Sequence, residues 1–317
     1  MLKQGATYVV KFLGTNGYEG REDGRYGDCV IIYDANNTQK NGMIVYDCGS
    51  EEHADRVIEF ASKNGIVQFD VILSHNHEDH FKGISKLVET GKVRSIFTTL
   101  LFKYVNDILK LLDDDRRTNP ATKERIKNLY DGIAELGNTI HEYNTDLKDI
   151  YENENELPDG IAFVAPDKNT LLQGVAEIIK NDDLNTPEGD DTIVNATSLQ
   201  IEVSLKDGNP LLLLGDATAD NIECDLENYF YIQLPHHGKF STAEAIFEKI
   251  GNNSLDEHTF IVSDNTGTTK AGSDELMKSK IVDGLDIKNT IDDDTVDIGE
   301  PPITTRHKVR ENFGVSI

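Results

Sequence analysis

The stretch DVILSHNHEDH, residues 70–80, runs from an apolar, strand-like segment into three histidines and two acids. The whole chain has only nine histidines, so a cluster of this kind is hard to attribute to chance. Imidazole and carboxylate groups are ligands that zinc, manganese and iron accept. Side chains at positions i and i+2 of an extended segment point the same way, so His75 and His77 can share one ion. Asp79 and His80 lie beyond the turn and can face a second ion. The pattern predicts a metal site at a strand end.

Two later strand ends carry residues of the same types. The segment LLLLGDATAD places Asp216 directly after an apolar strand, where a lone carboxylate is costly unless it is paired or bound to a metal. Its two oxygens can bridge two cations. The segment LPHHG ends another apolar strand with His236 and His237, which brings five of the nine histidines to two strand ends. The three segments together predict one site that holds two ions.

Charge and composition narrow the classes of function and compartment. The net charge is -26, whereas a surface that binds duplex DNA is normally basic, so generic binding to double-stranded DNA is disfavoured. Cys29, Cys48 and Cys224 are odd in number and have apolar neighbours, as expected for core residues in a reducing compartment. No stretch has the roughly 18 apolar residues that cross a bilayer, and the N-terminus does not resemble a signal peptide. We therefore expect a cytoplasmic protein without a membrane partner.

The order of the expected elements favours a layered α/β domain. Runs rich in Val, Ile and Leu predict strands within 7–13, 29–34, 42–47, 67–74, 93–99, 161–166, 197–205, 210–216, 228–238 and 259–265. Amphipathic spacing predicts helices after Ser50 and within 81–91, 241–251 and 273–284. We expect a single domain over residues 1–317, interrupted at about 100–156 by a helical insertion that could serve as a lid, a surface for a protein partner or a spacer.

This series of motifs resembles the metallo-β-lactamase superfamily, and most closely the branch typified by the soluble domain of the competence DNA-uptake protein ComEC. The matching segments, in chain order, are Gly27–Asp28 before CVII, VYDCG with Asp47, the 75–80 cluster, Asn195 to Ser198, Leu213 to Asp216, and Pro235 to Gly238. The resemblance implies a four-layer αβ/βα sandwich, with the helical insertion as an addition to it.

The resemblance also implies a role for each residue of the site. The implied metal ligands are His75, His77, Asp79, His80, Asp216 and His237. His75 and His77 would hold one ion, and Asp79 and His80 would hold the other. Asp216 would bridge both ions, and His237 would complete the second set of ligands. Asp79 and His236 would be catalytic, with His236 facing the substrate as a phosphate contact or proton donor, although the roles of His236 and His237 could be reversed. The residues expected to support the ligands or contact substrate are Asp47, Asn195 and Ser198.

The sequence departs from the superfamily pattern at two places. Most of the superfamily supplies a third histidine to the first ion, but no histidine lies between His141 and Asp216, and Asn195 stands there instead. The first ion would thus be held less tightly and could be recruited with substrate. The branch also tends to have a His-Pro pair where this chain has KAGSDE, at 270–275, which leaves the reaction open. The isolated histidines, interpreted as surface residues, are His53, His141, His258 and His307.

The expected reaction is hydrolysis of a phosphodiester by a metal-bound hydroxide. Two divalent metal ions would lower the pKa of a shared water enough to supply hydroxide near neutral pH. Zinc is the preferred choice for both ions, and manganese is the alternative. The substrate would be a nucleic acid end or single strand, or a small molecule. The alternatives are a small-molecule phosphoesterase, another hydrolase of the same fold, or a non-enzymatic module that binds a partner through the insertion. The acidic charge and the lack of a basic, aromatic-rich stripe stand against long nucleic acids.

Overall fold

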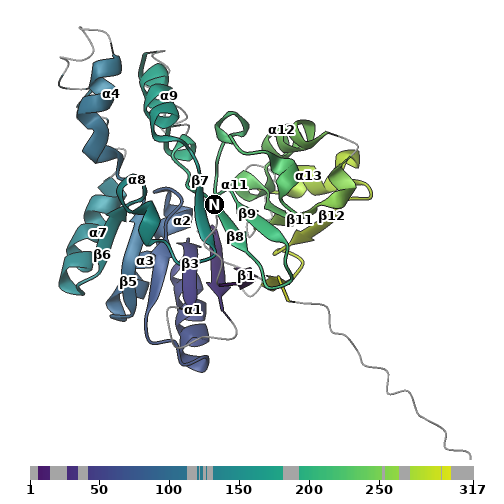
Figure 1. Ribbon diagram of the computed structural model, residues 1–317, viewed down its shortest axis with the longest axis horizontal. Helices are drawn as coiled ribbons and strands as arrows, with labels where there is room; N and C mark the ends of the chain where they lie inside the picture. The colour runs from purple at the N-terminus through teal and green to yellow at the C-terminus, as the bar shows by residue number, and fades with distance from the viewer. Residues whose placement is uncertain are drawn as a thin grey trace, which may run out of the picture.

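A computed structural model describes the protein as an α/β fold built on two sheets. The described residues are 6–14, 27–34, 42–112, 120, 122–123, 126, 131–180, 193–251, 254–263, 272–293 and 295–300. In Figure 1 most elements of the first half of the chain lie on one side of the molecule and most of those of the second half on the other, so the two sheets meet in the middle. The helix Lys168–Lys180 is an exception, because it lies on the side of the first half. The expected α/β architecture is confirmed.

Each half of the chain contributes most of one sheet. The seven-stranded sheet has the order β13 (Thr295–Ile298), β1 (Val9–Leu13), β2 (Cys29–Tyr33), β3 (Met43–Cys48), β4 (Phe69–Ile72), β5 (Val93–Thr98) and β6 (Asp146–Asp149). The six-stranded sheet has the order β12 (Asp286–Asn289), β11 (Thr259–Val262), β10 (Tyr231–Gln233), β9 (Pro210–Leu213), β8 (Gln200–Ser204) and β7 (Ile161–Ala165). Strands β3 to β6 run parallel to one another, as do β9 to β12, and the remaining pairs are antiparallel.

Helices cover the outer face of each sheet. The longer helices are α1 (Glu51–Lys63), α4 (Val105–Leu111), α7 (Asp131–Glu142), α9 (Lys168–Lys180) and α12 (Phe240–Ile250). The shorter ones are α2 (Glu78–Phe81), α3 (Ile84–Glu89), α8 (Ile150–Asn153), α11 (Pro235–Gly238) and α13 (Asp274–Lys278). The 3-10 turns are η1 (Leu101–Tyr104), η2 (Glu154–Glu156), η4 (Ala219–Asn221), η5 (Leu226–Asn228), η6 (Leu255–Glu257) and η7 (Lys280–Val282). Within the described ranges, every helix is too short or too polar to span a lipid bilayer.

Three apolar clusters hold these layers together. Strand β9 illustrates the principle, because alternate side chains of a strand point to opposite faces. Leu211 and Leu213 lie in the cluster between the two sheets, whereas Leu212 lies in the cluster beneath α12 and α13. The third cluster packs α1, α3, α4, α7 and α9 on the outer face of the first sheet. The order of layers is therefore helices, sheet, sheet, helices, as the four-layer sandwich requires.

The segment expected to be a helical insertion also contains part of the first sheet. Within 100–156 the described elements include β6, which pairs in parallel with β5 through Ser95 to Thr98. Helices α4 and α9 pack against each other and project from the body in Figure 1. Residues 113–119 and most of 120–130 lie outside the described residues. That residues 1–317 form a single domain stays a prediction.

The parallel strands place their carboxyl ends at the seam between the sheets. The stretch that follows β4 carries His75 to His80, that after β9 carries Asp216, and that after β10 carries His236 and His237. Ligands of open α/β sheets bind at the carboxyl ends of the strands, so this seam is the place to look for a site.

Candidate metal centre

Asp47 fixes the start of the histidine-rich loop. It ends β3 with a left-handed backbone (φ 57°), and its carboxylate is fully buried. Oδ1 accepts a hydrogen bond from Ser74 N at 2.7 Å, and Oδ2 accepts one from Ser74 Oγ at 2.7 Å. Oδ2 also lies 2.8 Å from His80 Nδ1. One carboxylate thus orients both ends of the loop, and it leaves His80 Nε2 free to face the seam.

His75 is oriented by two serine hydroxyls. Its Nδ1 lies 2.9 Å from Ser74 Oγ and 3.3 Å from Ser198 Oγ, which directs Nε2 into the site. Nε2 then lies 3.0 Å from His77 Nδ1 and 3.9 Å from Asp216 Oδ2. Ser198 comes from the second half of the chain, and its hydroxyl also accepts a hydrogen bond from Asp216 N at 3.2 Å. This serine therefore aligns a histidine of one sheet with the aspartate of the other.

The stretch around Asp79 is held against the first sheet by backbone contacts. Asp28 N donates to Asp79 O at 2.9 Å. Gly27 has a left-handed backbone (φ 56°), and a Cβ there or at Gly49 would overlap the Asp79 carbonyl group. Glycine is therefore required at both positions, because only a residue without a side chain lets the two backbones approach this closely.

Asp28 is a site residue to which the sequence interpretation gave no role. Its buried carboxylate lies 3.1 Å from His237 Nδ1 through Oδ1, and it accepts a hydrogen bond from Gln233 Nε2 at 2.7 Å through Oδ2. His237 Nε2 then lies 3.1 Å from Asp79 Oδ2. The Gly27–Asp28 motif was the available signal for this role, but only the fold shows that it reaches a histidine 209 residues away.

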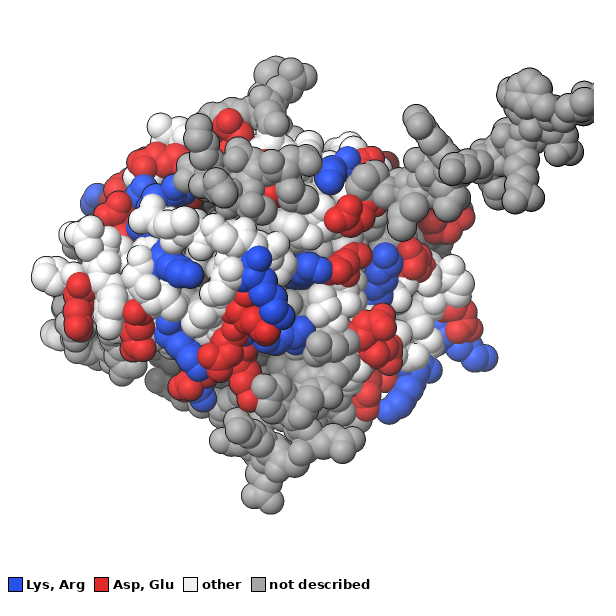
Figure 2. Space-filling view, turned by 90° about the horizontal axis from the view of Figure 1, so that it is seen from below, with Lys and Arg blue, Asp and Glu red and all other residues white. Residues whose placement is uncertain are grey.

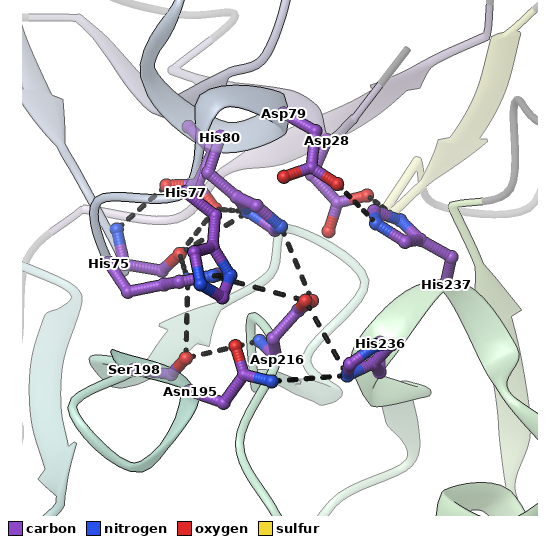
Figure 3. A network of polar contacts seen from close by, with 12 residues as sticks. Asp28, His75, His77, Asp79, His80, Asn195, Ser198, Asp216, His236 and His237 are labelled. Atoms are coloured by element: carbon purple, nitrogen blue, oxygen red, sulfur yellow. Dashed lines mark hydrogen bonds and ion pairs between the residues drawn. The ribbon is translucent and has the colours of Figure 1, made fainter. Parts of the chain in front are cut away.

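Asp216 lies at the centre of the cluster in Figure 3. Its Oδ1 is 3.3 Å from His80 Nε2, and its Oδ2 is 3.6 Å from His236 Nδ1, on the side that also faces His75. Asn195 completes that side, with Nδ2 3.5 Å from His236 Nδ1. Oδ1 therefore faces His80, whereas Oδ2 faces His75 and His236, so the two oxygens of one carboxylate lie against different imidazoles.

Burial and charge shift the pKa values of the cluster in opposite directions. Burial alone would lower the pKa of His80, but the carboxylates of Asp216 and Asp47 raise it well above its ordinary value. His237 is raised in the same way, against its burial, by Asp28 and Asp79. The pKa of His75 is instead lowered, by burial and then by the neighbouring charge of His80. The carboxylates thus concentrate positive charge on the side of the site that contains Asp79.

The geometry of the cluster fits divalent metal ions. Ligand atoms about 2.1 Å from a tetrahedral ion lie about 3.4 Å from one another, and the facing ligand atoms described above are 3.0 to 3.9 Å apart. His80 Nε2 and Asp216 Oδ1 are buried and make no hydrogen bond. Among the described residues, the groups whose atoms could hold an ion are His75 with His80 and Asp216, Asp79 with His80 and His237, and Asp28 with Asp47 and His80. Five of the six ligands expected from the sequence are in these groups. The sixth, His77, is in none of them, although its Nδ1 lies 3.0 Å from His75 Nε2.

Two histidines interpreted as surface residues are buried, so that interpretation was wrong for them. His53 is fully buried on the inner face of α1, and burial lowers its pKa to about 4. His258 is buried with its Nδ1 2.7 Å from Tyr229 O. His141 is exposed, as expected, and His307 lies outside the described residues. The signal for His53 was available, because it shares a helical face with Ala54, Val57 and Ala61.

The chain is similar to known proteins in part of its sequence and in its fold. The family model described as Metallo-beta-lactamase superfamily matches residues 23–170, which include the 75–80 cluster. The comparison with curated proteins gave no match. Among solved structures, the chain is similar to the metallo-beta-lactamase fold protein YhfI from Bacillus subtilis, with a TM-score of 0.45 and 13% identity over 89% of this chain and 96% of that one. Residues 23–170 therefore resemble the metallo-β-lactamase superfamily, and the α/β fold with two sheets is consistent with a metallo-β-lactamase sandwich.

Proposed function

We propose that this protein is a hydrolase that uses two divalent metal ions to cleave phosphodiester bonds. The observation that carries the proposal is the convergence of imidazole and carboxylate groups on Asp216, with His80 Nε2 and Asp216 Oδ1 buried and without hydrogen bonds. In this assignment His75 and His77 would hold the first ion, Asp79, His80 and His237 would hold the second, and Asp216 would contribute to both. Zinc is the first choice of metal, because it favours histidine and carboxylate ligands, and manganese is the second.

The ions would supply positive charge beside the phosphoryl oxygens and a water that is acidic near neutral pH. The protein's own groups position the reaction. Asp28, Asp47 and Ser198 fix the outer nitrogens of the histidines, which aims the inner nitrogens at the seam. The side chains of Asp79 and His236 remain 33% and 29% exposed, so substrate would approach from their side.

The charge of the chain favours a short or small substrate. The net charge of -26 opposes binding of a long polyanion, which is driven by Lys and Arg displacing counterions. On the face in Figure 2, the basic side chains drawn lie among acidic ones and form no broad basic area. The resemblance to the ComEC-type branch supports phosphodiester chemistry, so we favour a nucleic acid end, a short single strand or a small phosphodiester. A small-molecule phosphoesterase is the second candidate, supported by the same charge.

A metal-dependence assay tests this function. The metal-free full chain, reloaded with Zn²⁺ or Mn²⁺, is given labelled single-stranded DNA, RNA and bis-p-nitrophenyl phosphate. Cleavage should require metal and be lost in Asp79→Ala, while Asp283→Ala, which removes an exposed carboxylate away from the seam, should behave as wild type. The preferred substrate separates a nuclease from a small-molecule enzyme. Absence of bound metal and of turnover on all three substrates would refute the proposal and favour a module that binds a partner.

A further inference from the structure

His236 lies beside the candidate metal centre without belonging to it. Among the described residues, it is in none of the three groups whose atoms could hold an ion. Its side chain is 29% exposed, and its Nδ1 lies 3.6 Å from Asp216 Oδ2. The surroundings of His236 are therefore open to a substrate that extends beyond the ions.

Asn195 contacts His236 and carries a buried oxygen that has no partner. The residue is only 6% exposed, and its Nδ2 lies 3.5 Å from His236 Nδ1 (Figure 3). Its Oδ1 is buried and makes no hydrogen bond. Leaving a buried acceptor unpaired is unfavourable, so we expect a molecule bound at this place to supply the missing donor.

Lys239 is an exposed cation that directly follows the PHHG segment. Its backbone N donates a hydrogen bond to His236 O at 3.0 Å, which fixes the start of the side chain beside this histidine. Burial lowers the pKa of His236 and Asp216 opposes this effect, while the charges of His237 and Lys239 lower the pKa further. The ammonium group of Lys239 thus lies close enough to act on the imidazole. It forms no ion pair with any residue that the structure describes.

The position of Lys239 is electrostatically unfavourable for the helix that it begins. Lys239 is the N-cap of α12, its side chain makes no capping hydrogen bond, and the first turn of this helix has no acidic residue. Helix starts favour Ser, Thr, Asp or Asn and negative charge, because their unpaired amides carry partial positive charge. Helices α1 and α13 follow this rule, with two acidic residues in the first turn of each. A sequence that breaks a local rule in this way indicates a functional site, and here the result is positive charge gathered beside His236.

We propose that the region around His236 binds a second phosphate group of the substrate, with Lys239 as its cation, and that Asn195 Oδ1 accepts a hydrogen bond from a sugar hydroxyl of the same substrate. This proposal rests on the proposed function, because the ions would hold the first phosphate. It narrows the substrate class to a nucleic acid end or short strand with neighbouring phosphates, since an ester with a single phosphate leaves Lys239 without a partner.

Ligand binding tests the proposal without reference to turnover. The full chain loaded with Zn²⁺ is titrated by calorimetry with uridine 5′-monophosphate and with uridine 3′,5′-bisphosphate, neither of which contains a phosphodiester. Wild type should bind the bisphosphate about 10- to 100-fold more tightly, as expected for hydrogen bonds to a charged group. Lys239→Ser should lose most of this preference, and Lys239→Arg should keep it. Asn195→Leu should weaken both ligands to a similar extent, because both carry the sugar hydroxyls.

The matched control is Lys280→Ser, which makes the same change of charge in η7. That turn lies just before the amino end of β12, whereas the site lies at the carboxyl ends of the strands. Lys280→Ser should bind both ligands as wild type does. Lys239→Ser should also melt about 1–3 °C above wild type, because serine suits the start of a helix and lysine does not. This combination of higher stability and lost binding is not expected of a lysine with a structural role.

The outcomes separate this proposal from the proposed function. Equal affinity of wild type for the two ligands would overturn the second phosphate site, even if the chain cleaves bis-p-nitrophenyl phosphate, which has a single phosphate. A preference for the bisphosphate without cleavage of any phosphodiester would support the site and refute the reaction. Loss of the preference in Lys280→Ser as well would assign it to net charge and overturn the role of Lys239. Unchanged affinities in Asn195→Leu would overturn the role of Asn195.

Discussion

The two halves of the site are supported by different kinds of groups. In the half that contains Asp79, His80 and His237, the outer histidine nitrogens contact the buried carboxylates of Asp47 and Asp28. In the half that contains His75 and His77, the groups that contact the outer nitrogen of His75 are the hydroxyls of Ser74 and Ser198. Hydrogen bonds to a charged partner are roughly twice as strong as those between neutral groups. If each half holds an ion, as proposed, the carboxylate-supported half would bind its ion more tightly, and the hydroxyl-supported half would exchange its ion more readily.

The largest effect is expected where the two halves meet. Asp216→Ala removes the carboxylate whose Oδ1 faces His80 and whose Oδ2 faces His75 and His236. Bound metal should fall from two ions to one or none, and hydrolysis should fall by more than about 100-fold, because loss of a ligand exceeds the 10- to 100-fold cost of losing a supporting residue. Metal analysis after dialysis and an assay on bis-p-nitrophenyl phosphate measure both. Retention of two ions would contradict the bridging assignment, and Asp283→Ala again serves as the control.

Gly27→Ala tests how the carboxylate-supported half is fixed to the sheet. A Cβ at Gly27 would overlap the Asp79 carbonyl group, and the residue has a positive φ. We expect the free energy of unfolding in urea to fall by about 3–5 kcal/mol, the range for backbone strain combined with a buried clash. The matched control is Gly174→Ala in α9, where a Cβ meets no atom within 4 Å. That variant should gain about 0.5–1 kcal/mol from helix propensity. Equal effects of the two changes would show that the contact with Asp79 is dispensable.

His53 is a buried histidine that belongs to neither half of the site, and we expect it to make the stability of the protein depend on pH. Burial lowers the pKa of His53 from 6.5 to about 4, so the unfolded chain binds more protons than the folded chain between these values. Stability therefore rises with pH across this window, and it is lost as the pH falls from about 6.5 to about 4, by up to about 3 kcal/mol from this residue. Urea unfolding of wild type and His53→Leu at pH 7 and pH 4.5 measures the difference. If the dependence of stability on pH is unchanged in His53→Leu, other groups cause it.

The smallest effects compare the supports directly. Asp28→Asn should lower the affinity for one ion by about 10- to 100-fold, as expected when a charged residue that supports a ligand is lost. Ser198→Ala removes a neutral hydrogen bond to a histidine of the other half. Because a neutral hydrogen bond is about half as strong as a charged one, the affinity for the other ion should fall by only about 3- to 10-fold. Calorimetric titration of the metal-free variants with Zn²⁺ resolves the two sites. Equal losses in both variants, or losses from the same ion, would break the comparison between the halves.

Much of the candidate site could be predicted from the sequence because strand ends are local features. The apolar runs before His75, Asp216 and His236 end where β4, β9 and β10 end, within a few residues. Parallel strands bring their carboxyl ends to one edge, so residue types at strand ends suffice to propose a shared site.

The partners of these residues could not be predicted, because they depend on contacts between distant segments. The contact of Asp28 with His237 depends on how the two sheets stack, and no local pattern encodes this. The left-handed turn at His236 and His237 is also hidden, because only about a few per cent of residues other than glycine adopt this conformation, even though histidine is one of the enriched types. The misassignment of His53 had a different cause. The residue type outweighed a helical periodicity that placed it on the buried face.

The site's two halves are separated by more than 130 residues of chain, between His80 and Asp216, and this has a consequence during synthesis. A ribosome adds about 5–20 residues per second, so the early histidines emerge on the order of ten seconds before the later aspartate and histidines. A metal ion captured in that interval would meet only part of its ligand set and would exchange readily. The identity of any bound ion would thus be decided after the second sheet has folded onto the first, by the metals available in the compartment at that moment.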